Sequence, residues 1–402
     1  MRILVLSWEY PPNVIGGMGK HVTELTPALA QLGLDVHIVT PRLNGGKDCE
    51  VVSPGVTVHR VDAPTAAEAS DIYTSAWQAN RALEGALEKL WAEVGSFDLI
   101  HAHDWLTSFA AIALKLAQKC PLIATIHATE RGRARGAILH NDLQKSIHSA
   151  EWRLTYEAWR LIACSRFMAD EIGQYFEVPY EKIDIIPNGI DLVPFEEHNL
   201  QSTPAFRALY AQPDEDIIFS VGRIVHEKGL HILLNSAPQI LEKHPSAKFV
   251  IAGTGPALDW LRHLAWETGI GDKVLFPGFI SDEDRNRLFK LASCAVFPSL
   301  YEPFGIVALE AMAAGCPVVI SKVGGLAEVV EDGKTGITIT PEDPASTARG
   351  VLRAINPGDD TICRQVENAQ NVVRDVYSWE NTAAQTLEVY ERVVGERAQV
   401  DW

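Results

Sequence analysis

Residues 217–228 read IIFSVGRIVHEK, an apolar run of strand-forming residues that leads into a glycine turn and then a helical pattern. Residues 2–7, RILVLS, lead in the same way to Gly16 and Gly17 and a second helical pattern. Apolar runs without strict alternation are typical of parallel strands buried on both faces. Because such runs alternate with amphipathic stretches along the chain, the sequence predicts an α/β fold of two Rossmann-like, doubly wound domains that face each other across a cleft.

The strand pattern lapses in the polar segment 198–216, which suggests a boundary between two domains. We therefore predict an N-terminal domain over residues 1–195 and a C-terminal domain over 196–377. The sequence permits the last helix, at about 378–402, to pack back on the first domain. Ligands of doubly wound domains collect beyond the carboxyl ends of the strands, so the candidate site residues are those that follow the apolar runs.

Composition narrows the class of protein. The chain has 402 residues, 47% of them hydrophobic, which is enough for sizeable cores. Its 35 basic and 52 acidic side chains give a net charge of −17, which argues against nucleic-acid partners and anionic membranes. No apolar stretch approaches the roughly 20 residues of a membrane span, so no integral membrane segment is expected. The six cysteines show no metal-ligand spacing, as is typical of free thiols in a reducing cytoplasm.

Residues 301–310, YEPFGIVALE, place two carboxylates, Glu302 and Glu310, around the start of a predicted helix. Pro303 suits the first turn of a helix, because its missing N–H has no partner there. Gly305 allows a ligand to approach the backbone closely. Free amides at a helix start suit a phosphate, whereas a carboxylate beside them requires hydroxyl groups on the ligand. Phosphate together with hydroxyls indicates a sugar nucleotide.

Arg223 and Lys228 follow a buried strand in the segment SVGRIVHEKGL. Arg223 offers a planar fork of donors, and Lys228 is a compact point charge that opens a helix. Together they can bind a diphosphate and neutralise its charge as it leaves. The alternative is two surface cations on a loop, and their position after a strand favours the phosphate site.

Two glycine turns join strands to helices, one at Gly16 and Gly17 and one in residues 252–256, AGTGP. Glycines at such turns permit close backbone approach, so Gly16, Gly17 and Gly253 are candidate donor contacts. Neither turn has the full dinucleotide fingerprint or the P-loop spacing. A tight turn without a ligand is therefore the alternative at both positions.

Polar residues also follow two predicted strands of the first domain, in HAHDW at 101–105 and TIHATERGR at 125–133. We expect these side chains to line the acceptor side of the cleft and to hydrogen-bond sugar hydroxyls. A metal site is the alternative, but the helical ligand spacing of HExxH-type sites is lacking, so no metal is predicted. The residues concerned are His101, His103, Asp104 and His127.

Two further motifs have ordinary structural explanations. Asp282 and Asp284 could be read as a metal-binding pair, but they lie at a helix start, where acidic residues complement the dipole. Trp152, Tyr156 and Trp159 recur at helical spacing, which favours core packing over a platform for stacking carbohydrate.

Three segments resemble a known family. EPFGIVALE at 302–310 is similar to the Glu-x7-Glu signature of the retaining glycosyltransferases of family 4. SVGRIVHEKGL at 220–230 resembles their phosphate-binding segment, and IIPNGID at 185–191 their interdomain linker. The resemblance covers nearly the whole chain. It implies the two-domain GT-B fold, a nucleotide-sugar donor, a carbohydrate acceptor, and no catalytic metal or other cofactor.

In the C-terminal domain the resemblance implies a role for each matching residue. Arg223 and Lys228 would bind the donor diphosphate. Glu302 would contact the hydroxyls of the donor sugar, and Glu310 would hold the ribose. Phosphate would also be cradled by the backbone amides around Phe304, Gly305 and Ile306.

In the N-terminal domain the resemblance implies that Gly16 and Gly17 face the donor phosphates. His127 would sit beside the transferred sugar, where its backbone carbonyl could support positive charge at the anomeric carbon. Asp104 would lie near the acceptor.

HAHDW together with YPPNVIGG at 10–17 resembles the glycogen and starch synthases of this family. Val14, however, stands where bacterial glycogen synthases have the lysine of a Lys-x-Gly-Gly signature. The prediction is retaining transfer of a hexose, with glucose favoured, from ADP-glucose or UDP-glucose to a sugar or glucan hydroxyl in the cytoplasm. Sucrose-, trehalose- or mannosyl-type and cell-surface glycan transferases stay open. So do an epimerase or phosphorylase on the same fold and a non-catalytic sugar-nucleotide-binding protein.

Overall fold

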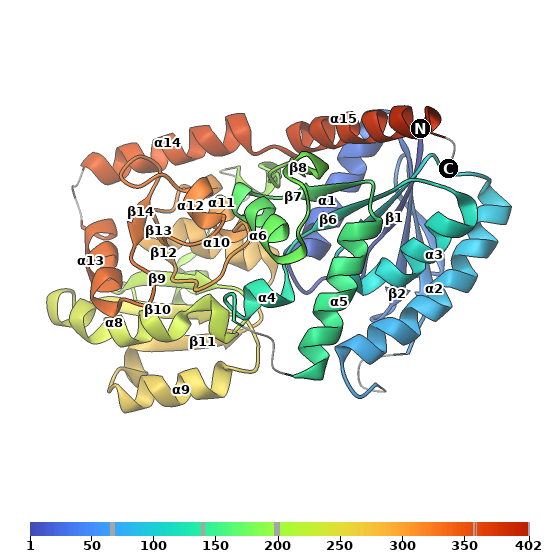
Figure 1. The fold of residues 1–402 in the computed structure, drawn as a ribbon. Coiled ribbons are helices and arrows are strands. Elements are labelled where there is room, and N and C mark those ends of the chain that lie inside the picture. Colours follow the sequence, from blue (N-terminus) through green and yellow to red (C-terminus); the bar gives the residue numbers. More distant parts are fainter. Residues whose placement is uncertain (65–68, 138–140, 197–201, 357, 359, 401–402) are drawn as a thin grey trace. The chain divides into compact units, whose positions relative to one another are not determined.

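The computed structural model describes residues 1–64, 69–137, 141–196, 202–356, 358 and 360–400. The chain divides into two compact units, Met1–Gly189 with Trp379–Trp402, and Ile190–Ser378 (Figure 1). The predicted boundary between 195 and 196 lies a few residues later in the chain than this division. Each unit is built around one sheet, and the last helix belongs to the first unit.

The first unit contains an eight-stranded sheet in the order β3-β4-β2-β1-β5-β6-β7-β8. Neighbouring strands are parallel, except that the edge strand β3 runs antiparallel to β4. Central strand β1 is buried on both faces, since residues 3–6 are at most 1% exposed. The strands are β1 (Arg2–Leu6), β2 (Asp35–Arg42), β3 (Cys49–Ser53), β4 (Val56–Asp62), β5 (Leu99–His103), β6 (Leu122–Ile126), β7 (Arg160–Ala163) and β8 (Ile183–Ile185).

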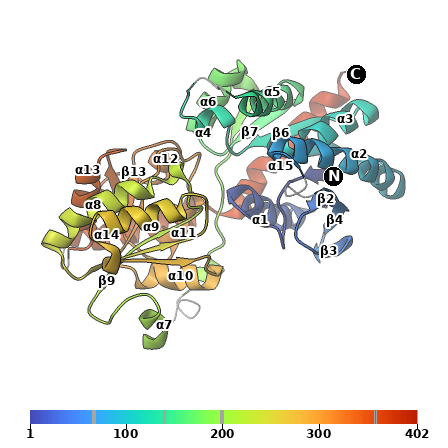
Figure 2. The same cartoon turned by 90° about the horizontal axis from the view of Figure 1, so that it is seen from below.

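Helices connect these strands and cover the sheet (Figures 1 and 2). Several begin with a side-chain cap, as where the Asp71 carboxylate accepts a hydrogen bond of 2.8 Å from the amide of Thr74. The helices of this unit are α1 (Gly17–Gln31), α2 (Ile72–Val94), α3 (Ser108–Gln118), α4 (Glu130–Arg133), α5 (Asp142–Glu157), α6 (Arg166–Phe176) and α15 (Trp379–Ala398), with short 3₁₀ turns η1 (Trp105–Thr107) and η2 (Tyr180–Lys182).

The C-terminal helix α15 packs into the core of the first unit, beside α1. Trp379 and Tyr390 are at most 5% exposed and share one apolar cluster with Val22 and Leu25 of α1. The Tyr390 hydroxyl lies 2.6 Å from Nδ1 of His101 in β5. The helix is therefore held both by apolar burial and by a buried hydrogen bond to the central sheet.

The second unit contains a six-stranded, fully parallel sheet in the order β11-β10-β9-β12-β13-β14. Its apolar runs are buried as the sequence pattern predicts, with residues 217–219 and 249–252 fully inaccessible. The strands are β9 (Asp216–Val221), β10 (Ala247–Ala252), β11 (Val274–Gly278), β12 (Cys294–Phe297), β13 (Val318–Ser321) and β14 (Ile337–Ile339).

Helices flank both faces of this sheet: in Figure 1, α14 lies on one side, and α8 and α9 lie on the other. Helix α8 packs against both α9 and α13, and α11 packs against both α10 and α14. The helices of this unit are α7 (Pro204–Ala208), α8 (Leu230–Lys243), α9 (Leu258–Glu267), α10 (Asp282–Leu291), α11 (Ile306–Ala313), α12 (Leu326–Val329), α13 (Pro344–Ala354) and α14 (Asp360–Val376), with 3₁₀ turns η3 (Val193–Phe195), η4 (His226–Lys228) and η5 (Gly271–Lys273).

These two sheets confirm the predicted α/β class with two doubly wound parallel domains. In a parallel sheet all carboxyl ends meet at one edge. In the second unit this edge gathers the segments that follow β9, β10 and β12, which hold the predicted donor-site motifs.

The aromatic residues of α5 differ from the expectation. Trp152 and Tyr156 are 48% and 68% exposed and stack on each other, with ring centroids 5.4 Å apart. Core packing is therefore the wrong interpretation for these two residues. They are four positions apart and so share one helix face, whereas the buried face of α5 is formed by Ile147, Ala150 and Leu154. Trp159 is different, because it packs against the core cluster around α15.

Candidate functional site

A pocket opens at the carboxyl ends of β9 and β12 in the second unit. It brings together three of the predicted site residues, Arg223, Lys228 and Glu302. Two of these are cations and the third is a carboxylate, so the pocket can bind an anion and hydroxyl groups at adjacent points. Its lining consists of Ser220, Val221, Gly222, Arg223, Lys228, Leu230, Phe297, Pro298, Ser299, Glu302 and Val307.

Lys228 and Glu302 form an ion pair in this pocket, with Nζ of the lysine 2.6 Å from Oε2 of the glutamate. Their side chains are 25% and 11% exposed, so the pair is largely shielded from solvent. The hydroxyl of Ser299 lies 3.4 Å from the same carboxylate oxygen. The pair fixes a positive and a negative group side by side although they are 74 residues apart in the chain.

Close backbone packing makes this pairing possible. Gly229 has φ +65°, and a Cβ atom there would lie 1.9 Å from the carbonyl oxygen of Pro298. Only glycine lets the loop after β9 approach the loop after β12 this closely. The amide of Leu300 then donates to the carbonyl of Glu227 at 2.8 Å, which ties the two loops together.

The YEPFGIVALE segment forms the start of α11, but with a different boundary from the predicted one. Gly305 adopts φ +102° and the helix begins at Ile306, so Pro303 precedes the helix and is not in its first turn. A Cβ atom on Gly305 would lie 2.5 Å from Leu326 Cδ2, which explains the requirement for glycine. Ile306 is the first helical residue. The amide of Ala308 donates to the carbonyl of the capping Gly305 at 2.9 Å, whereas the amides of Ile306 and Val307 come too early in the helix for an i−4 partner within it. Amides at such a helix start can bind an anion, and here they lie next to Glu302 in the chain.

Glu310 lies in the middle of α11 and is only 3% exposed. One of its oxygens, Oε1, lies 3.2 Å from Nη2 of Arg285 in α10. Sequence reasoning missed Arg285, because its helix reads as a solvent-facing charged helix with acidic residues at its start. That helix is capped by Ser281, and Asp282 and Asp284 lie in its first turn, as the helix-start interpretation predicts.

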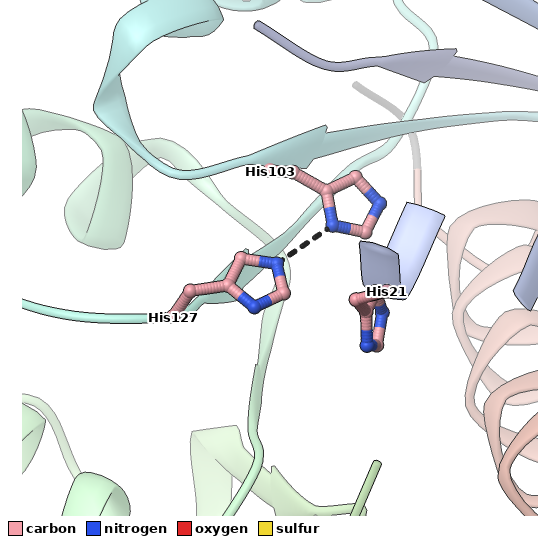
Figure 3. Close-up of side chains that lie close together, drawn as sticks. All are labelled: His21, His103 and His127. Carbon is pink, nitrogen blue, oxygen red and sulfur yellow. Dashed lines mark hydrogen bonds between the residues drawn. The ribbon is translucent and has the colours of Figure 1, made fainter. Parts of the chain in front are cut away.

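Three histidines converge at the carboxyl edge of the first sheet (Figure 3). Nδ1 of His103, at the end of β5, lies 3.0 Å from Nε2 of His127, which follows β6. His21 of α1 packs edge-on against His127 and uses Nδ1 to contact the side-chain oxygen of Asn188 at 2.7 Å. Burial lowers the pKa of both His21 and His127 to about 3, and that of His103 well below its ordinary value of 6.5. These imidazoles are therefore neutral at pH 7.

The histidine trio is better described as a hydrogen-bonded cluster than as a metal centre. Its candidate ligand atoms lie within 4.8 Å of one another, and one pair already shares a hydrogen bond. Zinc–nitrogen bonds of about 2.0–2.1 Å would bring tetrahedral ligand atoms to roughly 3.3 Å from one another, so the rings would have to move. His101 belongs to the core instead, because its two ring nitrogens contact Tyr390 and Thr125. The expectation that His101 lines an acceptor surface is therefore wrong.

Asp104 holds the backbone of His127 through a hydrogen bond. Its Oδ1 accepts a hydrogen bond of 2.7 Å from the backbone N–H of His127. The residue is 7% exposed and has φ +57°, a strained value for a residue other than glycine. Burial raises the pKa of its carboxyl from 3.8 to about 6. Asp104 thus positions the backbone of a predicted site residue at the cost of desolvating its own charge.

Comparison with known proteins identifies the family. The family described as "Glycosyltransferase Family 4" matches residues 15–193, and that described as "Glycosyl transferases group 1" matches residues 202–372. An uncharacterized glycosyltransferase of Methanocaldococcus jannaschii is 39% identical over 97% of this chain and 98% of its own. The glycogen synthase of Mycobacterium tuberculosis is 37% identical over 97% and 94%, respectively. The chain belongs to the family 4 glycosyltransferases.

A solved structure agrees with the assignment. A sucrose-phosphate synthase from Thermosynechococcus elongatus superposes with a TM-score of 0.82 at 25% identity, over 98% of this chain and 99% of that one. The two doubly wound units of this glycosyltransferase are therefore those of the GT-B fold, and the enzyme is a nucleotide-sugar-dependent transferase. Among the residues described, no helix is both long and apolar enough to cross a membrane.

The two glycine turns of this glycosyltransferase have different local explanations. A Cβ atom on Gly253 would lie 1.9 Å from the carbonyl oxygen of Gly222, so packing between neighbouring loops already requires glycine. Gly16 has open space where its side chain would be, but its amide donates to Oε2 of Glu9 at 2.9 Å. Sequence reasoning missed Glu9, whose carboxylate accepts from the amides of Ile15 and Gly16, the second of which is a predicted phosphate contact.

The raised pKa of Asp104 predicts a pH-dependent effect of Asp104→Asn. The folded state holds this proton up to about pH 6, whereas an unfolded aspartate releases it near 3.8, so ionisation of Asp104 reduces stability as pH rises between these values. Asparagine can still accept the His127 hydrogen bond and does not ionise. We expect the stability of the variant relative to wild type to increase by about 1 kcal/mol between pH 5 and pH 7. Urea denaturation at both pH values measures this difference, and a pH-independent difference would show that Asp104 is not protonated in the folded protein.

Proposed function

We propose that this glycosyltransferase moves a hexose, with glucose favoured, from a nucleoside diphosphate sugar to a hydroxyl of a sugar or glucan, with retention at the anomeric carbon. The observation that carries the proposal is the Lys228–Glu302 pair, which places an ammonium for a phosphate 2.6 Å from a carboxylate for sugar hydroxyls. A site that binds only phosphate would not need the Glu302 carboxylate. A site that binds only sugar would not need the two cations, Arg223 and Lys228. The donor is ADP-glucose or UDP-glucose in this proposal.

The chemistry follows from where charge develops. As the glycosidic bond to the diphosphate breaks, negative charge builds on the leaving phosphate and positive charge on the sugar ring. Arg223, Lys228 and the first amides of α11 would stabilise the phosphate, and interactions that strengthen in the transition state accelerate the reaction. Glu302 would accept hydrogen bonds from the donor sugar.

The proposal needs no side-chain nucleophile, metal or further cofactor. The leaving phosphate would take the proton of the acceptor hydroxyl on the same face of the sugar, which gives retention.

Glucan synthesis as the specific outcome is supported by the glycogen synthase of M. tuberculosis, 37% identical along nearly the whole chain. A cytoplasmic location fits the six free cysteines, four of them buried.

One second candidate has an observation in its favour, which is transfer to a small phosphorylated sugar. The segment that follows His127 carries Arg131, Arg133 and Arg135 within five positions of an otherwise acidic protein. Arg133 lies close enough to Asp104 to favour its ionised form, so this arginine is near the predicted acceptor region. The sucrose-phosphate synthase that superposes on this chain is named for a phosphorylated product.

Lys228→Ala and Arg223→Ala test the phosphate assignment. We expect each variant to lose about 10²–10³-fold in kcat/KM, the usual cost of removing one charged contact to a developing anion. Nucleotide release from the donor in the presence of acceptor measures the rate. Lys243→Ala, at the exposed far end of the helix that follows Lys228, is the matched control and should retain wild-type activity. Unchanged turnover in the Lys228 variant would place the diphosphate elsewhere.

A substrate screen separates the two candidate functions. ADP-, UDP- and GDP-sugars are offered with glycogen, maltose, glucose, a hexose phosphate or buffer, with and without EDTA. We expect transfer to glycogen or maltose that EDTA does not reduce, and an α-linked product from an α-linked donor by NMR. Transfer to the hexose phosphate alone would favour the second candidate. Complete loss of activity with EDTA would contradict the metal-independent mechanism.

A further inference from the structure

Arg285 joins two helices that begin at the same edge of the second sheet. Helix α10 follows β11 and α11 follows β12, so both start at carboxyl ends of parallel strands. Nη2 of Arg285 lies 3.2 Å from Oε1 of Glu310, and the two side chains are 14% and 4% exposed. This ion pair is the more buried counterpart of the pair that Lys228 makes with Glu302, in which the side chains are 25% and 11% exposed.

The guanidinium of Arg285 is held on several sides. Nη1 donates to Oδ1 of Asp282 at 2.7 Å, and Nε and Nη2 lie 3.2 and 3.1 Å from the side-chain oxygen of Asn286. Asn286 is 5% exposed, so a buried side chain holds the guanidinium of Arg285 in place. A lysine could supply the charge but not donors in these fixed directions. The position of Arg285, and with it the direction of its bond to Glu310, is therefore well determined.

The pair matters for what Glu310 can bind. A desolvated carboxylate is costly unless it is paired and hydrogen-bonded. A carboxylate accepts hydrogen bonds, and hydrogen bonds to a charged group are stronger than those between neutral groups. Two neighbouring hydroxyls, as on a ribose, are matching donors. Without Arg285, the Glu310 carboxylate would be a weaker and less well oriented hydrogen-bond acceptor.

We propose that Arg285 is a positioning residue that orients the Glu310 carboxylate toward the ribose of the donor, and that it thereby sets the preference for ribonucleotides over deoxyribonucleotides. The inference rests on the proposed function, in which Glu310 holds the ribose. A merely structural role, with Arg285 only tying α10 to α11, would lower stability without changing this preference.

The test measures the binding of ADP and UDP, and of their 2′-deoxy and 3′-deoxy forms, to the full-length protein by calorimetry. Wild type should bind the better ribonucleotide at least about tenfold more tightly than one of its deoxy forms, as for the loss of a hydrogen bond to a charged group. Arg285→Met should reduce that ratio to about threefold or less, with little change in affinity for the deoxy form. Arg285→Lys should give an intermediate ratio. Thermal melting of each variant shows whether it is folded.

Arg287→Met is the matched control, because Arg287 lies in the same helix but pairs with Glu283 at 2.6 Å. It should keep the wild-type ratio. A folded Arg285→Met variant with an undiminished ratio would overturn the inference, and if that variant fails to fold, an undiminished ratio in Arg285→Lys would do so. Absence of any ribose preference in wild type would overturn both this inference and the ribose role of Glu310. The proposed glycosyl transfer is tested separately, by the activity of the wild-type enzyme in the substrate screen.

Discussion

The candidate donor site of the second unit is built around one contact, the ion pair between the Lys228 ammonium and the Glu302 carboxylate at 2.6 Å. It joins the loops that follow β9 and β12, which are neighbours in the sheet although far apart in sequence. The loops can meet only because Gly229 packs against the carbonyl of Pro298 without a side chain. The amide of Gly325 also donates to the carbonyl of Glu302 at 2.9 Å. Parallel strand order, glycine packing and opposite charges thus converge on a site for a ligand that is both anionic and rich in hydroxyls.

The first unit stabilises its candidate residues in a different way, through burial of neutral groups. Burial away from water is the main reason why the pKa values of the His21, His103 and His127 imidazoles are lowered, so these rings are neutral at pH 7. Burial also raises the pKa of the Asp104 carboxyl to about 6, so this group is still largely ionised at pH 7 and places a negative charge beside the His127 backbone. At neutral pH the three imidazoles are therefore uncharged and the Asp104 carboxylate is negative. Such a region suits a sugar or a developing positive centre better than a phosphate.

Local patterns were sufficient to predict most of the fold. Val-, Ile- and Leu-rich runs such as residues 217–219 lie in fully buried parallel strands, as their lack of alternation indicates. The two glutamates and two cations of the donor motifs could be found because each follows such a run. Boundaries were less certain: the left-handed conformation of Gly305 starts α11 at Ile306 and leaves Pro303 outside it. A Cβ atom on Gly305 would also lie 2.5 Å from Leu326 Cδ2, a neighbour that the local sequence does not indicate.

The remaining features depend on tertiary contacts. Nothing near Arg285 in the sequence indicates that it reaches Glu310, because the two lie on different helices. The contact of His21 with Asn188 is equally non-local, because the two residues are 167 positions apart. The bond that the Gly16 amide donates to Glu9 spans only seven positions, but it is a loop contact that no motif indicates. Trp152 and Tyr156 show that the helical spacing of aromatic residues does not predict their burial. The same spacing occurs on a buried face and on an exposed face of a helix. Which face is buried is decided by neighbours that the local sequence does not contain.

The central claim is that the diphosphate of a sugar nucleotide binds at the carboxyl edge of the second sheet. A crystal structure of the protein soaked with ADP or UDP tests it most directly. We predict phosphate oxygens within hydrogen-bonding distance of Arg223, Lys228 and the first amides of α11. A well-ordered nucleotide whose phosphates contact none of these groups would contradict the account.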